Sequence, residues 1–536
     1  ISCSLVGSEM CIRDRYRMAY IMKKNMIIVG AGLAGLSAAL QAVKEGCSVK
    51  LISSLPSERA QSVMAEGGIN AALNTKGEDD STQEHYEDTI KAGCNLADPN
   101  AVWNMTQAAP EVVKWLHSIG VQFNTCGYDE LDLRNFGGQK KKRTAFAKSD
   151  TGKQIMTAMI DAVRRLEVQG QIERFEHHSF RTLLMTANIC HGCVVCDNYT
   201  GEIKMLYADA VIVASGGMHG LFGNTTGSLA NTGEVSASLF SAGVPMANLE
   251  MIQYHPTTVE IGGKKMLISE AARGEGGRLF TYRDGNRWYF MEEKYPELGN
   301  LMPRDITARE IWKISKESPV YLDMTEIPKD VTDRKLAGLV SDCQIYLHKD
   351  IRKEPVQVVP GIHYFMGGIY VDEKHRTPVR NLYAAGECCA QYHGANRLGG
   401  NSLLGAIYGG RIAAQTACED AMTAKDMLVT ETQELADLCE SISQPDKKKI
   451  NKIMLNTLGV VRNRKRMEEE LEKLCQIKGS LSLLGQAAIM SAIERTESRG
   501  AHYREDYPKK NDDFARTTIA SYNGQKIQLS LIHISE

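Results

Sequence analysis

The sequence predicts an α/β chain built around a split, Rossmann-like nucleotide-binding domain. The first observation is a short apolar run, residues 26–29, that leads into a glycine turn at residues 30–35 and then into a helix-like stretch. The second is that two distant apolar runs, residues 210–214 and 382–385, are also of strand length and also lead into glycine. Distant strands that return to one parallel sheet indicate a domain interrupted by an insertion.

The glycine turn has the spacing G-x-G-x-x-G, in which each glycine has a separate task. Gly30 makes the turn, Gly32 admits a pyrophosphate to the backbone, and Gly35 lets the helix pack against the strand. The phosphate then lies at the N-terminus of the helix. Placed between this strand and this helix, the pattern predicts nucleotide binding.

The strand that completes the βαβ unit, residues 48–52, is followed by Ser53 and Ser54. NAD-binding proteins have an acidic residue there that holds the ribose, so NAD is disfavoured. A nucleotide domain interrupted by an insertion is typical of flavoproteins. In that interpretation Glu387, which follows the strand at 382–385, holds a ribityl hydroxyl.

Composition excludes several other classes of protein. The 536 residues carry 63 Lys and Arg against 65 Asp and Glu, so no overall positive charge exists to attract nucleic acid. No uninterrupted apolar run reaches the roughly eighteen residues needed to span a bilayer. Glycine is plentiful at 47 and proline is scarce at 14, as expected where the backbone approaches a ligand closely.

The 14 cysteines are dispersed and lack the density of a secreted disulfide framework, which favours a reducing cytoplasm. One cluster, Cys190, Cys193 and Cys196, has the spacing of part of an iron–sulfur motif but lacks the fourth cysteine. The segment has the pattern of a strand, on which Cys193 would point to the face opposite the other two. We interpret the three cysteines as structural and expect no metal site.

Polar clusters gather in the insertion between the last two strands and just after it. They are QYHPT at residues 253–257, SEAARGEGG at 269–277, PRD at 303–305, GIHY at 361–364 and HGANRLGGNSL at 393–403. Arginine offers a planar fork that matches a carboxylate, and histidine adds a donor whose charge is adjustable near neutral pH. Together the clusters predict a site for a small dianion.

This ordered set of motifs resembles the flavoprotein subunit of fumarate reductase and succinate dehydrogenase. The likeness begins at the glycine turn and runs through AEGG at residues 65–68 and the polar clusters to SRGAHYREDYP at 498–508. It therefore covers nearly the whole chain. The resemblance implies FAD as the cofactor and the interconversion of fumarate and succinate as the reaction.

The resemblance also implies a role for each matching residue. The residues that would hold the two carboxylates, and twist one of them out of conjugation so that the double bond accepts a hydride from the reduced flavin, are His255, Ser269, His363 and Arg397. Arg304 would deliver the proton to the neighbouring carbon, with Glu270 and Arg273 as its relay. The unperturbed pKa of arginine lies above about 12, so we expect crowding by other arginines to ease the donation.

One position departs from the membrane-bound members of the family. The residues that the resemblance places at FAD are Gly30, Ala31, Gly32, Gly35, Ser53, Ser62, Ala65, Glu66, Gly67, Gly68, Glu387, Asn401, Ser402 and Leu403. Gln61 stands where those members carry the histidine that bonds the flavin covalently. A carboxamide cannot form that bond, so we expect noncovalent FAD, which in this family favours fumarate reduction over succinate oxidation.

Two alternatives remain open. L-aspartate oxidase shares the HPT, RGEG and GANR motifs, but it needs a carboxylate for the substrate ammonium and has a glutamate in an Arg-Glu-Gly-Gly stretch. This sequence reads NFGG at 135–138, and Phe136 suits an unsubstituted C4 dicarboxylate instead. The other alternative is a flavin-binding subunit without catalysis of its own, which the complete set of polar clusters disfavours.

The domain boundaries that we expect follow from these assignments. They are FAD-binding residues 26–250 and 361–422, an inserted α+β capping domain at 251–360, a helical domain at 430–508 with a connection near 441–446, and a C-terminal segment at 509–528. Residues 1–17 and 529–536 resemble translated adaptor read-through, and we expect them to be foreign. The basic run at 139–143 has the pattern of a solvated loop or, alternatively, a docking site for a partner.

The resemblance implies partners as well as chemistry. The family form receives electrons from an iron–sulfur subunit and a membrane anchor, and this chain offers no convincing cluster ligands in its sequence. We therefore expect a cytoplasmic protein, or one held peripherally on the cytoplasmic face of a membrane by such subunits.

Overall fold

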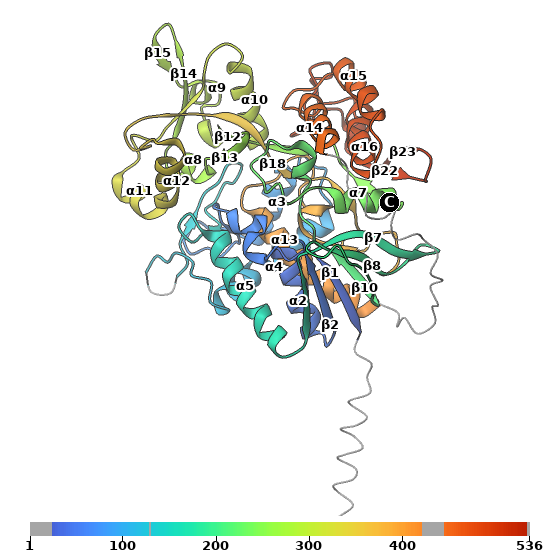
Figure 1. The fold of residues 1–536 in the computed structure, drawn as a ribbon. Coiled ribbons are helices and arrows are strands. Elements are labelled where there is room, and N and C mark those ends of the chain that lie inside the picture. The colour runs from blue at the N-terminus through green and yellow to red at the C-terminus, as the bar shows by residue number, and fades with distance from the viewer. Residues whose placement is uncertain (1–23, 128–129, 421–443, 533–536) are drawn as a thin grey trace, which may run out of the picture.

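The computed structural model describes residues 24–127, 130–420 and 444–532, and one parallel sheet lies at its centre (Figure 1). The five strands run in the order β20-β10-β1-β2-β6. Their bounds are β1 Asn25–Val29, β2 Ser48–Ser53, β6 Ile172–Glu176, β10 Ala210–Val213 and β20 Leu382–Ala384. Every pairing in this sheet is parallel, so strands from distant parts of the chain lie side by side. The split Rossmann-like fold predicted from the sequence is confirmed.

The glycine turn after β1 is tightly packed on both sides. Gly30 has a φ of +116°, and a Cβ atom added to it would lie 2.2 Å from the carbonyl oxygen of Ala214, just after β10. A Cβ atom on Gly35 would lie 1.8 Å from the carbonyl oxygen of Gly30, because helix α2 (Leu33–Lys44) starts directly over the turn. Neither position has room for a side chain, as expected if Gly30 makes the tight turn and Gly35 lets the helix pack against the strand.

The central strands separate two apolar cores. One core lies between the sheet and a layer of four helices, which are α2, α4 (Pro99–Ser118), α5 (Thr151–Val168) and α13 (Asn401–Asp420). Along β1, Met26 and Ile28 belong to this core, whereas Ile27 and Val29 belong to the core on the other face. This alternation is what a parallel strand buried on both faces requires.

The second core is covered by an antiparallel sheet and by helices from the C-terminal part of the chain. The sheet consists of β7 (His178–Thr186), β8 (Ile189–Asp197) and β9 (Ile203–Tyr207). The helices are α7 (Glu234–Ser241), α14 (Gln444–Thr457), α15 (Arg464–Cys475) and α16 (Ser480–Glu494). The C-terminal helices therefore share a core with the nucleotide domain and do not form an independent unit.

A cap projects from the central domain at the upper left of Figure 1, whereas α14–α16 lie at the upper right. Its first sheet, in the order β13-β12-β18, consists of β12 (Ile252–Ile261), β13 (Lys264–Leu267) and β18 (Val359–Phe365). Its second sheet, in the order β15-β14-β16-β17, consists of β14 (Arg278–Arg283), β15 (Asn286–Trp288), β16 (Tyr321–Asp323) and β17 (Val356–Gln357). Its helices are α8 (Glu270–Gly274), α9 (Phe290–Lys294), α10 (Arg304–Ile314), α11 (Lys329–Lys335) and α12 (Ala337–Leu347).

The remaining elements brace the central domain. They are α3 (Thr82–Ala92), α6 (His219–Phe222), the small sheet of β3 (Ile69–Asn70), β4 (Leu133–Arg134) and β5 (Thr144–Ala145), and the sheet of β11 (Met246–Ala247), β19 (Gly368–Tyr370), β21 (Cys389–Ala390), β22 (Thr517–Tyr522) and β23 (Ile527–Ile532). Residues 529–532 of the expected foreign tail thus pair with β22. The expected foreign segment 1–17 and residues 430–443 of the expected helical domain lie outside the described residues. In the described ranges no helix is long and apolar enough to span a membrane.

Two local expectations need correction. Cys190 and Cys193 both pack into the second core, because the strand pairing shifts register at Gly192, so strict alternation does not hold in β8. Helix α14 includes Pro445 in its first turn, where a missing backbone N–H costs nothing. The connection expected near 441–446 stays a prediction, because residues 441–443 lie outside the described residues. Arg143 of the basic run is fully buried, contrary to a solvated loop.

The partners of Arg143 explain its burial. Its Nη2 lies 2.8 Å from Asp80 Oδ1 and 3.1 Å from Asp88 Oδ2, two residues that precede it by more than fifty positions. The run of like charges therefore contains one arginine with a structural ion pair.

Burial also raises the pKa of Cys190 to about 12, so this thiol stays protonated at neutral pH.

Candidate active site

A cavity of about 820 Å³ lies between the central domain and the cap. Most of the predicted site residues line it, namely Gly30, Ala31, Gly32, Ser53, Ser62, Ala65, Glu66, Gly67, Gly68, Phe136, His255, Ser269, Glu270, Arg304, His363, Glu387, Arg397, Ser402 and Leu403. Gly35, Arg273 and Asn401 do not. The cavity is therefore continuous from the glycine turn after β1 to the polar clusters of the cap.

The end of the cavity near β1 suits a dinucleotide. Ser62 Oγ accepts a hydrogen bond from the backbone N–H of Leu33 at 3.3 Å, and a Cβ atom on Gly32 would lie 3.5 Å from the same oxygen. Two buried oxygens of the wall, Ser53 Oγ and Glu66 Oε2, have no hydrogen-bond partner in the protein. Polar atoms left without partners in a large cavity fit a ligand that carries hydroxyl and amide groups, as FAD does.

Glu66 is the most strongly perturbed carboxyl in this wall. Burial, and then the nearby carboxylate of Asp342 on α12 of the cap, raise its pKa to about 8. A neutral carboxyl can donate a hydrogen bond, which a carboxylate cannot. Glu66 therefore presents both a donor and an acceptor to the cavity at neutral pH.

Glu387 and Asn401 were both predicted to contact FAD, but only Glu387 lines the cavity. Glu387 lines the cavity, and its Oε1 accepts a hydrogen bond from the backbone N–H of Phe365 at 3.1 Å. Asn401, at the start of α13, is fully buried away from the cavity. Its Oδ1 lies 2.7 Å from Asn70 Nδ2 and 2.9 Å from His85 Nε2. The Asn401 side chain therefore secures the helix start and leaves the cavity wall to Ser402 and Leu403.

Gln61, the residue at the position of the flavin-linking histidine, lies in the cavity wall. Its side-chain oxygen accepts a hydrogen bond from the backbone N–H of Ser228. The carboxamide oxygen is thus already held by a contact within the protein.

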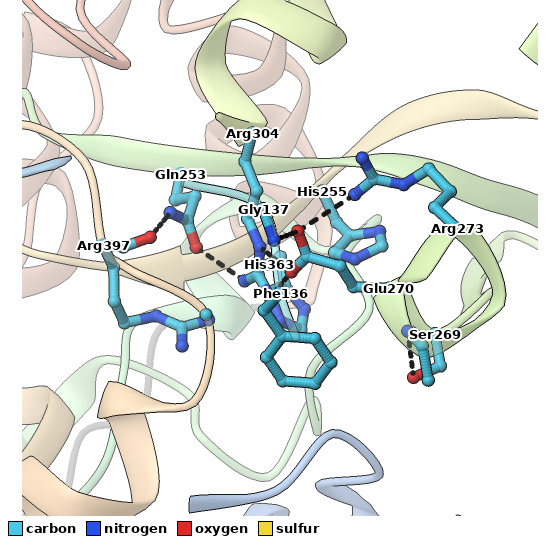
Figure 2. Close-up of polar contacts among 12 residues, drawn as sticks. Phe136, Gly137, Gln253, His255, Ser269, Glu270, Arg273, Arg304, His363 and Arg397 are labelled. Atoms are coloured by element: carbon cyan, nitrogen blue, oxygen red, sulfur yellow. Dashed lines mark hydrogen bonds and ion pairs between the residues drawn. The ribbon is translucent and has the colours of Figure 1, made fainter. Parts of the chain in front are cut away.

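At the cap end, Arg304 and Glu270 form a buried ion pair (Figure 2). Arg304 is the first residue of α10, and its Nε and Nη2 lie 2.9 Å and 2.5 Å from Glu270 Oε2. Its Nη1 lies 3.0 Å from Gln253 Oε1. The other oxygen of Glu270, Oε1, accepts from the backbone N–H of Gly137 at 3.1 Å and from Arg273 Nη2 at 3.3 Å. Both oxygens of this carboxylate are therefore occupied.

Three guanidinium groups lie around this carboxylate. Figure 2 shows Arg397 and Arg273 on opposite sides of the pair formed by Arg304 and Glu270. Burial, and then the charge of Arg304, lower the pKa of Arg397 to about 9. Burial also lowers the pKa of Arg273. Burial acts to raise the pKa of Glu270, but the charges of Arg304 and Arg273 hold it below its ordinary value.

Two histidines complete the cationic end of the cavity. The rings of His255 on β12 and His363 on β18 lie 5.1 Å apart, because the two strands pair with each other. His363 Nδ1 lies 2.9 Å from Thr226 Oγ1, and His255 Nδ1 lies 3.1 Å from the carbonyl oxygen of Thr257. Burial, with Arg304 contributing for both, holds the pKa of each ring well below its usual value. Each ring is therefore neutral, and both histidines line the cavity.

Phe136 and Ser269 have distinct positions at this end. Phe136 is 1% exposed, and its ring is so close to the backbone that a Cβ atom on Gly67 would lie 2.9 Å from it. Ser269 caps α8 by accepting a hydrogen bond from the backbone N–H of Ala271 at 3.4 Å. The cap helix that carries Glu270 and Arg273 thus begins at a residue of the cavity wall.

The sequence did not single out Gln253 or Thr226 as site residues. Gln253 donates to Asn396 Oδ1 at 2.9 Å and to the carbonyl oxygen of Arg397 at 2.8 Å, while it accepts from Arg304. It therefore joins the two arginines. The available signal was its place in the same QYHPT cluster as His255, whereas Thr226 lies in no cluster.

Comparisons with known proteins agree with this geometry. The sequence profile described as an FAD binding domain matches residues 25–403, and that described as the fumarate reductase flavoprotein C-term matches residues 479–535. The chain is 39% identical to the succinate dehydrogenase flavoprotein subunit of Bacillus subtilis, over 93% of this chain and 94% of that protein. It is 33% identical to the L-aspartate oxidase of Pyrococcus furiosus, over 92% of this chain and 98% of that protein.

The fold has close counterparts among solved structures. The quinol fumarate reductase chain of E. coli superposes with a TM-score of 0.87 and 27% identity, over 96% of this chain and 97% of that chain. The chain therefore belongs to the family of FAD-dependent oxidoreductases that contains the flavoprotein subunits of succinate dehydrogenase and fumarate reductase, together with the L-aspartate oxidases.

Proposed function

We propose that the chain interconverts fumarate and succinate at a noncovalently bound FAD, and that it works mainly as a fumarate reductase. The observation that carries this proposal is the buried contact between Arg304 and Glu270, at the end of the cavity where His255, His363 and Arg397 also converge. Two arginines and two neutral histidines around one small volume match the charge and size of a C4 dicarboxylate.

In this proposal Arg397, His255, His363 and Ser269 hold the two carboxylates of the substrate. Arg397 supplies a charged fork, and its guanidinium lies 4.3 Å over the ring of Tyr364, which fixes its orientation. Burial keeps both histidines neutral, so each ring carries a single N–H. In this proposal that proton is on Nε2, and Nδ1 is the acceptor, from the backbone N–H of Thr257 for His255 and from Thr226 Oγ1 for His363. One carboxylate is then held by a cation and the other by neutral donors, which favours a twist between them.

Arg304 holds the proton that is delivered to the substrate carbon in this proposal. FAD, when bound, supplies the hydride for the other carbon. Arg304 donates to Glu270, which also accepts from Arg273, so a proton lost from Arg304 has a continuous hydrogen-bonded route for its replacement.

Noncovalent attachment of FAD is supported by Gln61. Its carboxamide has no nucleophilic nitrogen to bond the flavin, and it already accepts a hydrogen bond from Ser228. Acid precipitation of the yellow protein tests this point. We expect a colourless pellet and free FAD in the supernatant, and a yellow washed pellet would contradict noncovalent attachment.

L-aspartate oxidation is the second candidate, because aspartate oxidases are also among the relatives. An aspartate substrate brings an ammonium group that needs a carboxylate. Phe136 lies fully buried beside Gly67 and Gly399 at this point of the cavity and offers only an apolar ring. The chemistry of that ring favours fumarate and succinate over aspartate.

Electrons reach the flavin from a partner in this proposal. We propose an iron–sulfur protein as that partner, with a membrane anchor beyond it, and a location in the cytoplasm or on the cytoplasmic face of a membrane. The relative from Bacillus subtilis is itself named as a subunit, which supports a multi-protein assembly.

Turnover by the purified, FAD-loaded protein tests the reaction. We expect reduced viologen dye to be oxidised rapidly with fumarate, a phenazine-type acceptor to be reduced slowly with succinate, and neither oxygen consumption nor iminosuccinate formation with aspartate. Aspartate-dependent oxygen consumption without fumarate reduction would establish the second candidate instead. Absence of all three activities in a protein that retains FAD would indicate a noncatalytic flavin-binding subunit.

A further inference from the structure

Two cysteines far apart in the sequence meet at the edge of the central domain. Cys47 lies just before β2, and Cys418 lies in the last turn of α13. Their Sγ atoms are 2.9 Å apart although 371 positions separate them, and neither is in a disulfide. A disulfide bond is about 2.05 Å long, so the two sulfurs need to approach by only about 1 Å to form one.

The surroundings of the pair favour a thiolate at Cys47 and a thiol at Cys418, because the contact with Cys47 and burial raise the pKa of Cys418. The hydrogen bond with Cys418 lowers the pKa of the Cys47 thiol against the opposing effect of burial, and the ammonium of Lys24 lowers it further. Lys24 is fixed in place because its Nζ donates to the carbonyl oxygen of Cys418 at 2.5 Å. The opposing carboxylates of Glu45 and Asp209 act less strongly on Cys47. A thiolate beside a thiol is the reactive form in disulfide exchange.

The two cysteines differ in exposure, which sets an order of events. Cys418 is partly exposed, whereas Cys47 is 3% exposed. A reagent in solution therefore reaches Cys418 first, and Cys47 can react only with a group already attached there. This arrangement combines an accessible cysteine with a buried resolving cysteine.

We propose that Cys47 and Cys418 form a reversible disulfide when the protein meets a low-molecular-weight disulfide. Cys418 first passes its proton to the Cys47 thiolate across the 2.9 Å contact. The Cys418 sulfur then attacks one sulfur of the reagent, forms a mixed disulfide and releases the other half as a thiolate, which takes up the proton from Cys47. The Cys47 thiolate then attacks Cys418 Sγ and releases the second half. Two protein thiols are oxidised, one reagent disulfide is reduced to two thiols, and the two protons pass to the released thiolates.

The bond would join two elements that frame the cavity. β2 ends at Ser53 and α13 begins next to Ser402, and both residues line the cavity. The disulfide would join the start of β2 to the end of α13, which are the ends of these two elements away from the cavity. It closes a very long loop, so it restricts the unfolded chain strongly and raises the melting temperature.

Peptide mapping of the FAD-loaded protein tests the proposal. The protein is incubated with oxidised glutathione, alkylated and digested without reductant, in the wild-type form and as Cys47→Ser, Cys418→Ser and Cys475→Ser. Cys475 is an exposed cysteine on α15 and serves as the control. In the wild type we expect a cross-linked pair of peptides that contain Cys47 and Cys418, and dithiothreitol should separate them.

The variants distinguish the order of events. Cys47→Ser should retain glutathione on Cys418, Cys418→Ser should leave Cys47 unmodified, and Cys475→Ser should form the same cross-link as the wild type. The melting temperature of the oxidised wild type should exceed that of the reduced wild type by about 3 °C or more, with no such rise in Cys418→Ser. Glutathione on Cys475 without the cross-link, or metal retained by the pair after oxidation, would overturn the proposal.

Discussion

Arg304 directs two of its nitrogens at a single oxygen of Glu270, with Nε at 2.9 Å and Nη2 at 2.5 Å, and its third nitrogen at Gln253. All three nitrogens of the guanidinium are therefore used, and the group is held in one plane. A residue with a single terminal nitrogen cannot keep these contacts together. The geometry explains why an arginine, despite its high intrinsic pKa, is suited to this position.

Arg304→Lys should keep FAD and lose nearly all turnover. The lysine ammonium retains the positive charge but cannot contact Glu270 and Gln253 at the same time, so the donor moves away from the substrate carbon. A correctly placed general acid contributes about 100-fold to 10,000-fold in rate, and we expect fumarate reduction by reduced viologen to fall by at least about 100-fold.

The matched control for this variant lies on the same helix. Arg309 donates to Asp305 Oδ2 at 3.3 Å and to the carbonyl oxygen of Gly500 at 3.3 Å, and it does not line the cavity. Arg309→Lys should keep most of the activity. Equal rates for the two variants would show that the proton comes from another group.

Glu66→Gln should change how FAD affinity depends on pH. The pKa of Glu66 is raised to about 8, and bound FAD removes the remaining water around the carboxyl, which favours its neutral form further. FAD affinity of the wild type should therefore be constant below about pH 8 and fall by up to about tenfold per pH unit above it. Glutamine is always neutral, so the variant should lose this decline.

Fluorescence titration of the apoprotein with FAD between about pH 6 and pH 9.5 measures this effect. Glu58→Gln is the control, because Glu58 lies in the same segment but is exposed and paired with Arg164. It should keep the pH dependence of the wild type. A decline that persists unchanged in Glu66→Gln would assign it to a different group.

Gly399→Ala should reduce turnover without loss of FAD. A Cβ atom on Gly399 would lie 2.9 Å from Glu270 Oε2 and 3.0 Å from Phe136 Cδ2, so the carboxylate and the ring would both have to move. A misplacement of about 1 Å at reacting groups costs about 100-fold in rate, and kcat for fumarate should fall to that extent.

Gly459→Ala provides the comparison for this variant. Its added Cβ atom would lie 3.8 Å from the carbonyl oxygen of Leu455, which is ordinary van der Waals contact. Steady-state kinetics and the ratio of FAD to protein should be those of the wild type. If Gly399→Ala matched it in kcat, contact with the Gly399 backbone would not be what positions Glu270.

The parts of the fold that the sequence predicts well are those governed by short-range rules. The strands expected at 26–29 and 48–52 occur as Asn25–Val29 and Ser48–Ser53, because an apolar run beside a glycine turn has few other solutions. Conversely, the register shift at Gly192 depends on pairing with β7, which no local pattern in β8 reveals.

Site residues follow the same division. The glycine turn and the polar clusters lie around one cavity because each is a contiguous motif. Within the cluster at 393–403, Asn401 does not line the cavity and instead contacts Asn70 and His85, which come from segments more than three hundred positions earlier. Arg143 is similar, since only the fold brings Asp80 and Asp88 to it. Motifs thus identify the site, whereas single polar side chains are assigned only by their distant partners.

Arg495→Met should destabilise the C-terminal part of the protein strongly. Arg495 lies just after α16, is fully buried, and donates to Glu250 Oε1 at 2.7 Å, to Glu497 Oε1 at 3.1 Å and to Thr518 Oγ1 on β22 at 2.7 Å. Methionine has similar length but leaves two buried carboxylates without this cation. Removal of one partner from a buried ion network costs about 3–5 kcal/mol.

An exposed ion pair on the neighbouring helix gives the matched control. Arg464 Nε lies 2.7 Å from Glu468 Oε1 on α15, with side chains 54% and 49% exposed, so solvent screens the pair. Arg464→Met should cost less than about 1 kcal/mol. Amide hydrogen exchange in β22 reports the difference: exchange should accelerate sharply in Arg495→Met and hardly at all in Arg464→Met. Equal acceleration would mean that apolar packing of α16, and not the Arg495 network, holds the C-terminal sheet to the nucleotide domain.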